Sequence, residues 1–456
     1  MLTLIELTAS LGGLYSASNI VQFLDIFESF FESTLSTTTR SLSRYSSQSL
    51  RSWFRFLSRG YDWVLIRVCI FKHFCFDAGS TYLLVADETV EGKSGKHSHG
   101  ISKFYSSTAG EAINGVCFFG MSLVDVQSKT SYMMGVQQVT YSDLDRRRIA
   151  LSKAKKIERA KMKKEGNQMN RGRKKGTKNK PKEENPSASY RVFKTLFSSV
   201  TSSLISICPK ITIAYLVIDT AYGTSDYEAL SQAANMPIIS KLRSTAALYL
   251  PFSGESNSMA ARPRGRKRVY GEKLAMDAIP ESMLVKTENN NEHKTEIYHL
   301  NAHAKNTFGQ KLLNVVIQRK TRLCDQKVAT NIWFSTDPNL DFQTLLDYYS
   351  LRFQIEFDFR DAKQHFGLSD FKNYKQENLT NFVNLSFTMC LLAKVQLAYY
   401  RKLLYAPKLS IIDLKLIYKA RFTAKNILKL VRKDHDTIFN EQFCEQFLPQ
   451  DLINAA

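Results

Sequence analysis

The chain has 456 residues, of which 44% are hydrophobic and 12% aromatic, so it can bury a large core in two or three domains and is not a disordered basic tail. Its 63 Lys and Arg against 42 Asp and Glu give a formal net charge of +21, which indicates a polyanionic partner such as nucleic acid. The seven cysteines form no Cys-x2-Cys pair and exclude a disulfide framework, and the N-terminus lacks the pattern of a secretory signal, so we expect a cytoplasmic protein.

Residues 1–75 are predicted to form a helical DNA-binding region. Residues 38–57 combine a polar Ser-rich turn, an apolar segment and repeated Arg, as a helix-turn-helix does. Arg51 and Arg55 lie on the predicted second helix and are expected to face DNA. A basic pair of helices that only packs on the core is the alternative.

The first apolar run that ends in a carboxylate is residues 82–87, which closes with Asp87. Its length and composition predict a buried strand. A polar turn follows, and strands are predicted near residues 115–126 and 131–139, which would form a meander of hairpins after the aspartate. Taken alone, an aspartate in this position is more often a strand-end turn or helix-cap residue.

Positive charge is concentrated between Arg146 and Lys182, where seventeen Lys or Arg stand against two Glu. We predict a basic loop over 146–184 that contacts DNA, since opposite charges are almost absent. The DNA contacts expected in its Gly-containing part are Arg171, Arg173, Lys174 and Lys175. A solvated charged loop is the alternative.

A second apolar run, residues 215–219, predicts another buried strand and ends in Asp219. The chain from Asp219 to the glutamate discussed next is far longer than one crossover helix needs. We therefore predict an insertion at 225–338 that is mainly β, with a short helix near 225–234 and strands around 238–241, 295–300, 311–319 and 327–335.

The most informative pattern lies within residues 339–400, where Tyr349, Arg352, Glu356 and Lys363 stand at offsets of zero, three, seven and fourteen. On one continuous helix these side chains would share one face. Cations and a phenol suit DNA phosphates, whereas a glutamate among them would repel DNA unless it held a metal ion. An ordinary amphipathic helix with a charged face is the alternative.

The C-terminal part is predicted to be helical. Residues 382–400 are apolar, but Asn384, Lys394 and Gln396 interrupt them and indicate a buried helix and not a membrane span. Residues 401–456 should form a helical C-terminal region that serves dimerisation or DNA contacts.

Two aspartates at strand ends and a glutamate on a helix could converge. Three carboxylates that come together repel one another, and hard divalent cations relieve that repulsion. Two Mg²⁺ or Mn²⁺ ions held by Asp87, Asp219 and Glu356 would activate an attacking oxygen and stabilise a leaving oxygen at phosphorus. The residues thus point to phosphodiester chemistry.

Over about residues 35–400 the chain resembles the insertion-sequence transposases with an Asp-Asp-Glu triad, in particular the insertion sequence four group. Tyr349, Arg352, Glu356 and Lys363 fill that group's Tyr-x2-Arg-x3-Glu-x6-Lys signature, and Asp87 and Asp219 match its aspartates by strand context. The resemblance implies an α/β fold in which a ribonuclease H-like catalytic core, residues 76–224 and 339–400, carries a mainly β insertion domain and is flanked by helical terminal regions.

The resemblance also implies a DNA transposase that cuts the ends of its element with metal ions and joins the released 3′-hydroxyl to target DNA. Expected partners are double-stranded DNA, as terminal inverted repeats and as target, and a second copy of the chain in a homodimer on DNA, with no membrane. Two alternatives remain: a ribonuclease H-like nuclease or resolvase without strand transfer, and a non-catalytic DNA-binding derivative.

Overall fold

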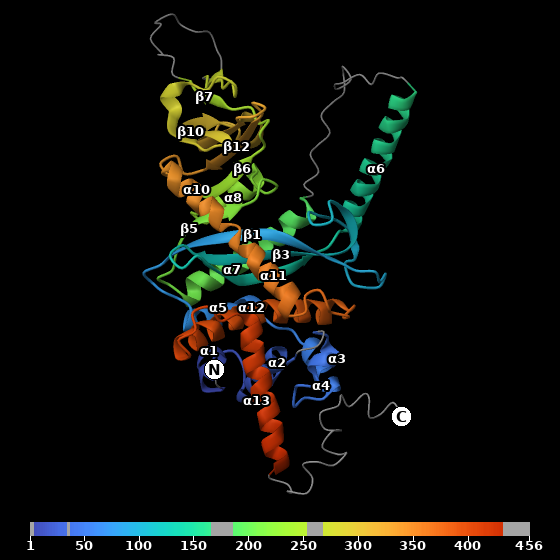
Figure 1. Ribbon diagram of the computed structural model, residues 1–456. Helices are drawn as coiled ribbons and strands as arrows, with labels where there is room; N and C mark the ends of the chain where they lie inside the picture. Colours follow the sequence, from blue (N-terminus) through green and yellow to red (C-terminus); the bar gives the residue numbers. More distant parts are fainter. Residues whose placement is uncertain (1–3, 34–36, 166–185, 253–267, 432–456) are drawn as a thin grey trace, which may run out of the picture.

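A computed structural model describes residues 4–33, 37–165, 186–252 and 268–431, and a large mixed sheet runs through it (Figure 1). The strand order is β2-β3-β1-β5-β6-β12-β11-β10-β7-β8, with β4 paired to β3 and β9 paired to β10. The strands are β1 (Thr81–Gly92), β2 (Ser102–Ser106), β3 (Glu111–Asp125), β4 (Thr130–Val139), β5 (Thr212–Ile218), β6 (Ile238–Leu242), β7 (Tyr249–Pro251), β8 (Tyr270–Lys273), β9 (Leu284–Asn289), β10 (His293–His303), β11 (Leu312–Arg322) and β12 (Val328–Ser335). The fold is therefore mixed α/β.

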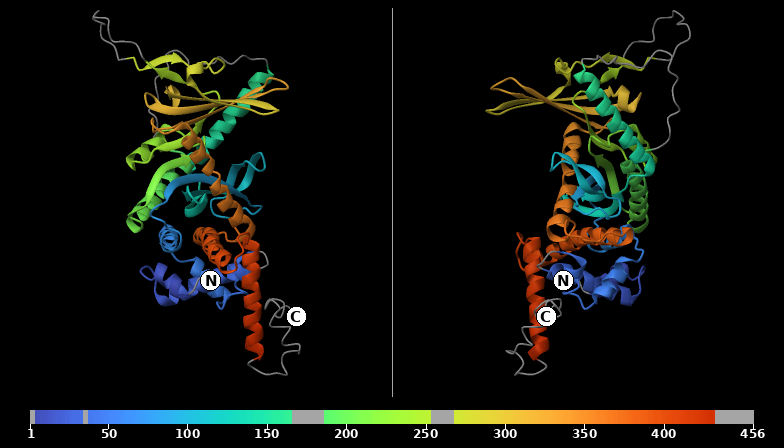
Figure 2. Two further views of the ribbon diagram at one scale, coloured as in Figure 1. Left: turned by 60° about the vertical axis from the view of Figure 1, so that its left-hand side comes forward. Right: turned by 90° about the vertical axis from the view of Figure 1, so that its right-hand side faces the viewer.

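Helices pack on the middle of the sheet and form one end of the molecule. Figures 1 and 2 place the N-terminal helices and α13 at that end, and β7 to β10 at the other. The helices are α1 (Leu4–Leu11), α2 (Ala17–Glu32), α3 (Thr39–Leu42), α4 (Leu50–Leu57), α5 (Trp63–Phe74), α6 (Asp143–Lys164), α7 (Ala188–Ile207), α8 (Ser225–Ala233), α9 (Lys305–Phe308), α10 (Phe342–Leu351), α11 (Gln354–His365), α12 (Gln376–Leu403) and α13 (Ile411–Val431), with a 3-10 turn at Glu281–Met283.

The part of the sheet that carries both aspartates combines antiparallel and parallel pairs. β4, β3 and β1 pair antiparallel, whereas β1 pairs in parallel with β5, and β5 with β6. The strands predicted near 115–126 and 131–139 are β3 and β4, so the meander after Asp87 is confirmed.

The alternating side chains of β1 give the sheet two buried faces. Leu83 and Val85 belong to the hydrophobic cluster that includes α11 and α12, whereas Leu84 and Ala86 belong to the cluster that includes α7. Successive side chains of a strand point to opposite faces, so Asp87 continues the face of Leu83 and Val85. The pattern of β1 thus directs Asp87 toward α11.

The helical character of the N-terminal region is confirmed, but the predicted helix-turn-helix is wrong in its first helix. α3 has 4 residues, and α4 has 8. The Ser-rich turn between them is held by Asp25 of α2, which accepts hydrogen bonds from the Ser46 hydroxyl and the Ser47 backbone N–H. The Ser46 hydroxyl also accepts a hydrogen bond from the N–H of Gln48 at 3.0 Å, and serines that bond to the nearby backbone in this way compete with helix formation.

The predicted basic loop over 146–184 is wrong in its first part, because residues 143–164 form the helix α6, which projects from the sheet (Figure 1). Ala, Lys, Arg and Leu favour helix, and the acidic Asp143 and Asp145 lie in its first turn, where they suit the positive end of the helix dipole. The other predicted DNA contacts of this run, Arg171, Arg173, Lys174 and Lys175, lie outside the described residues.

The predicted helix near 225–234 and the four predicted strands that follow it correspond to α8, β6, β10, β11 and β12. The sequence did not predict β7, β8 and β9, which are short and mostly polar or exposed. β12 pairs antiparallel with β6, so the strands of this segment extend the same sheet.

α12 passes through the core at the base of the sheet. It is the one helix in the described ranges that is long and apolar enough to cross a membrane, and 78% of its most apolar window is buried inside the structure. The fully buried Arg67 of α5 ties it to the sheet, donating to the carbonyl of Met134 (2.9 Å) and to the side chain of Asn384 (2.9 Å). The prediction of a buried helix is confirmed.

Glu32 at the end of α2 should make folding stability depend on pH. Burial, together with the nearby charge of Glu28, raises the pKa of its carboxyl group to about 8. The folded protein therefore keeps a proton on Glu32 at pH values where the unfolded chain has already released it. The free energy of unfolding is highest below the ordinary pKa of a glutamate and falls as the pH rises toward 8. We expect Glu32→Gln to raise the melting temperature at pH 8 and flatten its decline from pH 6, whereas Glu377→Gln, at an exposed site, should not. Equal pH profiles for Glu32→Gln and wild type would contradict this.

Candidate active site

The segment that carries the Tyr-Arg-Glu-Lys pattern is not one helix. α10 ends at Leu351 and α11 begins at Gln354, so the prediction of a single continuous helix is wrong. The N–H groups of Arg352 and Phe353 bond to carbonyls three residues back, at 3.1 and 3.2 Å. Such a tight turn brings side chains three positions apart into line, and the Arg352 guanidinium accordingly lies 5.8 Å from the ring centre of Tyr349.

Asp87 and Asp219 lie side by side because their strands are in register. Ala86 pairs with Ile218 in the parallel ladder, and each aspartate is the next residue. Asp219 begins a turn after β5, where its carbonyl accepts hydrogen bonds from the N–H groups of Tyr222 (3.0 Å) and Gly223 (3.2 Å). Asp87 itself lies in the middle of β1, so the prediction that its strand ends at this carboxylate is wrong, because β1 stays paired with β3 as far as Gly92. Asp219 directly follows β5, as predicted. The parallel register still brings the two aspartates together.

Glu356 comes to the same place from α11, which packs over β1 and β3 (Figure 1). Gly120, the β3 partner of Asp87, permits the close approach, because a Cβ atom there would lie 2.8 Å from the ring of Phe359 on α11. Asp87, Asp219 and Glu356 line one pocket of about 720 Å³, together with Arg352 and Lys363. The structure therefore brings together the three predicted carboxylates and two of their predicted companions.

Arg352 is the cation closest to the aspartates. One guanidinium nitrogen lies 2.5 Å from Oδ2 of Asp87, and the other lies 3.9 Å from Oδ1 of Asp219. The Tyr349 hydroxyl donates to the same Asp219 oxygen at 3.4 Å. Two residues that the sequence assigned to DNA phosphates thus contact carboxylates in the structure.

The electrostatics of the pocket reflect burial and crowding of like charges. The pKa of Asp87 is raised to about 6, mainly by burial and to a smaller extent by the charges of Glu356 and Asp219, although Arg352 acts in the opposite direction. Burial alone would lower the pKa of Arg352, but the negative charge of Asp87 and its neighbours more than offsets this and raises it. The guanidinium thus stays charged and neutralises part of the carboxylate cluster.

The family description "DDE superfamily endonuclease" matches residues 35–303, which include Asp87, Asp219 and more than half of the chain. The chain belongs to the DDE superfamily endonucleases. No curated protein matches it. Glu356 lies beyond the matched residues, so its place beside the aspartates is a finding of the structure.

Membership in the DDE endonucleases implies DNA as substrate and a divalent metal ion as cofactor. Within the described ranges, no three His, Cys, Asp or Glu side chains are already grouped as a metal site, and a guanidinium bridges the two aspartates. The donor set nevertheless fits a hard cation, since three carboxylates line one pocket that already holds a positive group. Asp87, Asp219 and Glu356 are the residues that could hold it.

Lys363 is turned toward β1, where its ammonium group lies 2.8 Å from Oε1 of Glu91. The other oxygen of Glu91 accepts from Ser369 at 2.9 Å. Glu91 was missed in the sequence, although Asp87, Thr89 and Glu91 alternate along one face of β1 and mark it as polar. This ion pair fixes the end of α11 against the strand that carries Asp87.

Two residues from the segment predicted as an insertion contact the ring of Tyr349 beside this pocket. Trp333 of β12 lies 6.3 Å from the ring of Tyr349, and the ammonium of Lys241 on β6 lies 4.7 Å from the Trp333 ring. Burial lowers the pKa of Lys241, and Asp219 opposes this shift. Trp333 is buried and packs against Tyr349.

Arg51 and Arg55 do not line this pocket. Both are exposed on α4, at the end of the molecule that the N-terminal helices form (Figure 2). Their predicted contact with DNA is thus at a separate surface.

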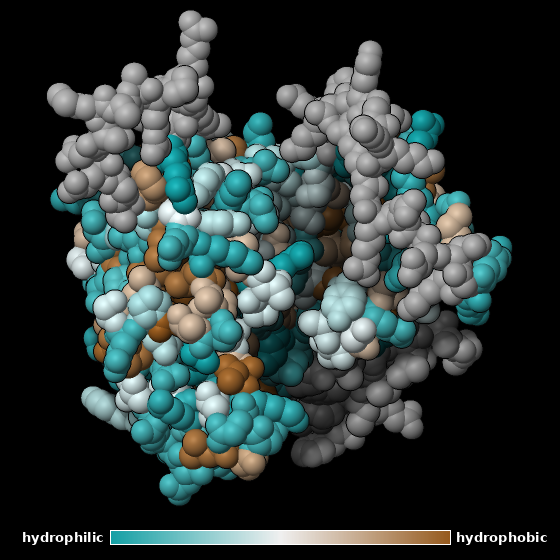
Figure 3. Space-filling view, turned by 90° about the horizontal axis from the view of Figure 1, so that it is seen from above, coloured by the Kyte–Doolittle hydropathy of each residue, from teal (hydrophilic) through white to brown (hydrophobic). Residues whose placement is uncertain are grey.

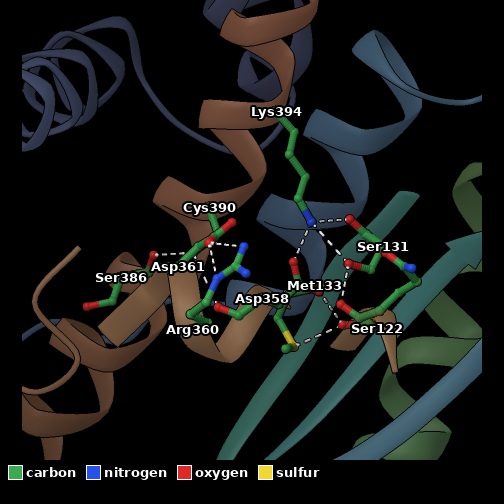
Figure 4. Close-up of polar contacts among 10 residues, drawn as sticks. Ser122, Ser131, Met133, Asp358, Arg360, Asp361, Ser386, Cys390 and Lys394 are labelled. Carbon is green, nitrogen blue, oxygen red and sulfur yellow. Dashed lines mark hydrogen bonds and ion pairs between the residues drawn. The ribbon is translucent and has the colours of Figure 1, made fainter. Parts of the chain in front are cut away.

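A buried ion pair holds α11, the helix that carries Glu356, against α12. Asp358, two residues after Glu356, contacts the ammonium of Lys394 on α12 and accepts a hydrogen bond from Ser122 of β3 at 2.8 Å (Figure 4). Lys394 also donates to the Ser131 hydroxyl at 3.1 Å. The network joins α11, α12 and the sheet, and it sets the position from which Glu356 reaches the pocket.

We expect Asp358→Ala to destabilise the protein by about 3–5 kcal/mol, because it leaves the Lys394 ammonium buried without its carboxylate. Denaturant unfolding would measure this. Asp361→Ala on the same helix breaks a pair with the half-exposed Arg360 and should cost less than about 1 kcal/mol. The double variant Asp358→Leu with Lys394→Met should be more stable than Asp358→Ala. Similar losses for Asp358→Ala and Asp361→Ala would contradict the anchoring role.

Proposed function

We propose that the chain is a DNA transposase that cleaves the ends of its element and joins them to target DNA. The observation that carries the proposal is the convergence of Asp87, Asp219 and Glu356 in one pocket, with Glu356 inside a complete Tyr-x2-Arg-x3-Glu-x6-Lys pattern. The strand arrangement β4-β3-β1-β5-β6, antiparallel and then parallel, supports a ribonuclease H-like core.

In this proposal Asp87, Asp219 and Glu356 hold two Mg²⁺ or Mn²⁺ ions, which supply activation of the attacking oxygen and stabilisation of the leaving oxygen. The protein's own task is to bind and orient the strand. Arg352 would move its guanidinium from Asp87 to a phosphate, since a planar fork suits phosphate as well as carboxylate. Lys363 and the exposed Arg360 line the same pocket and would hold the neighbouring phosphates.

We propose a shorter insertion than the predicted 225–338, on the basis of strand pairing. β6 pairs in parallel with β5, so we assign α8 and β6 to the core and place the insertion at β7 to β12. We also propose a homodimer on DNA, for which the basic charge supports the DNA binding, and a cytoplasmic location, which the buried position of α12 supports.

α6 is proposed as a DNA-binding arm. Lys155, Lys156 and Arg159 are exposed along it, and the face of the molecule seen from above is hollowed between the side of α6 and that of β7 to β10 (Figure 3). Replacing all three with Ala should weaken binding to any duplex and reduce the salt slope by up to about 0.9 per lost phosphate contact. The charge-conserving variant Lys155→Arg, Lys156→Arg, Arg159→Lys is the control. An unchanged salt slope in the Ala variant would contradict the proposal and would indicate that α6 is only a solvated charged helix.

Strand transfer distinguishes the proposal from its alternatives. The purified protein is mixed with Mg²⁺, a supercoiled target plasmid and oligonucleotides that carry the inverted repeats flanking its reading frame. Joined products support a transposase. Cleavage without joining favours a nuclease or resolvase, and binding without cleavage favours a non-catalytic derivative.

A further inference from the structure

A second pocket, of about 610 Å³, lies where the N-terminal helices meet the segment that leads into α12. It is lined by α3, α4 and residues 372–378, and it is separate from the pocket that holds the carboxylates. No Asp or Glu is among the described residues that line it, whereas Arg40, Lys372 and Lys375 are. Its charge therefore suits an anion.

Two aromatic rings of this pocket are open to solvent. Phe54 on α4 is 42% exposed and Tyr374 is 58% exposed, whereas most other rings of the N-terminal helices are buried. Planar rings beside cations are the combination with which proteins bind unpaired nucleotides, because the ring stacks on a base and the cation neutralises a phosphate. A volume of this size accommodates a nucleotide.

Asn378, in the wall of this pocket, is held in place by two hydrogen bonds. Ser58 donates to Oδ1 of Asn378 at 3.1 Å, and the Asn373 amide donates to the Asn378 carbonyl at 3.3 Å. An asparagine held in this way can read the edge of a base. Arg51 and Arg55 lie three positions before and one after Phe54 on α4, so Arg51 shares the helix face of Phe54.

The pocket is linked to the carboxylates through the chain that follows Asp87. Lys93, just after β1, lies 3.6 Å from the ring centre of Phe371, and the N–H of His99 donates to the carbonyl of Tyr374 at 2.9 Å. Six residues of extended strand from Asp87 to Lys93 span about 20 Å. A strand bound in the carboxylate pocket would thus need to continue for several nucleotides to reach Tyr374.

We propose that this pocket binds an unpaired nucleotide of a DNA strand, with its base between Phe54 and Tyr374 and its phosphate on Arg40, Lys372 and Lys375. The inference rests on the proposed function, because the pocket would bind one part of the same DNA strand that is cleaved beside Asp87. It predicts that the protein prefers DNA with an unpaired segment to fully paired DNA.

The test measures binding of the full chain to fluorescein-labelled oligothymidine and to a blunt duplex, by fluorescence anisotropy in EDTA. Phe54→Ala and Tyr374→Ala should each weaken oligothymidine binding at least about fivefold, with a smaller effect on the duplex. Phe54→Trp should retain binding, since it keeps a stacking surface. Tyr405→Ala, which removes a 92% exposed ring outside the pocket, should bind as wild type.

Wild-type affinity of Phe54→Ala and Tyr374→Ala for oligothymidine would overturn the inference, as would an equal loss in Tyr405→Ala or an equal loss for the duplex. Competition by inorganic phosphate as strong as that by oligothymidine would assign the pocket to free anions and overturn it too. Metal is absent from this assay. A wild-type protein that fails to cleave DNA would therefore contradict the proposed transposase while the stacking result stood on its own.

Discussion

Asp87→Asn, Asp219→Asn and Glu356→Gln are each expected to lower metal-dependent DNA cleavage by about a thousandfold, with DNA binding changed only a fewfold. Each substitution keeps the shape of the side chain and removes one negative charge from the pocket that the three residues share. A metal ion contributes several kcal/mol to stabilising the transition state at phosphorus, and about 4 kcal/mol corresponds to a thousandfold in rate. Single-turnover nicking of labelled duplex in Mg²⁺ would measure the loss.

The control for the triad is Asp226→Asn, an exposed aspartate on α8 that lies outside the pocket. It should cleave at the wild-type rate. If Asp87→Asn, Asp219→Asn or Glu356→Gln kept more than a few per cent of wild-type cleavage, that residue would not be a metal ligand. Loss of DNA binding in parallel with cleavage would show that the substitution had disturbed the fold.

Arg352→Ala should change metal affinity and cleavage in opposite directions. Its guanidinium now contacts Asp87 and approaches Asp219, so it competes with any cation for the same oxygens. Its removal should tighten Mn²⁺ binding by at least about fivefold, since a charge at this distance is worth several kcal/mol even when well screened. Cleavage should become slower, with a loss of about 1–3 kcal/mol in the free energy that stabilises the transition state, because the strand loses a bidentate phosphate ligand.

Lys363→Ala is the matched comparison for Arg352→Ala. Lys363 pairs with Glu91 and not with the aspartates, so we expect its removal to leave Mn²⁺ affinity unchanged while weakening cleavage. Titration calorimetry or electron paramagnetic resonance gives the affinities. Weaker Mn²⁺ binding in Arg352→Ala would mean that Arg352 supports the fold of the site and does not compete with metal.

The sequence was sufficient for those parts of the site that depend on local pattern. The apolar runs before Asp87 and Asp219 predicted β1 and β5, and the alternation of Leu83, Val85 and Asp87 determines the face on which the carboxylate lies. The glutamate was found because Tyr349, Arg352, Glu356 and Lys363 follow a recognisable spacing. These features depend on neighbours within a few residues.

What the sequence could not provide depends on contacts between distant segments. The break between α10 and α11 places Arg352 on Asp87, which lies 265 positions away in the chain, and no local preference marks it. The ion pair of Lys363 with Glu91 could not be predicted from the sequence, because the two residues are 272 positions apart in the chain. The buried contact of Asp358 with Lys394 could not be predicted either, because in the sequence both residues look like ordinary charged residues on the surface of helices.

The basic run shows the converse limit. Charge alone does not separate a loop from a helix, and in the described part of this run the helix-favouring Ala, Lys and Arg residues between 143 and 164 form α6.

The most direct test of the central claim is the anomalous diffraction of Mn²⁺ in crystals of the protein bound to uncleavable DNA. The account predicts anomalous density bordered by Asp87, Asp219 and Glu356, with the Arg352 guanidinium moved from Asp87 to a phosphate. Anomalous density elsewhere, or an Arg352–Asp87 pair that persists with DNA and Mn²⁺ bound, would contradict it.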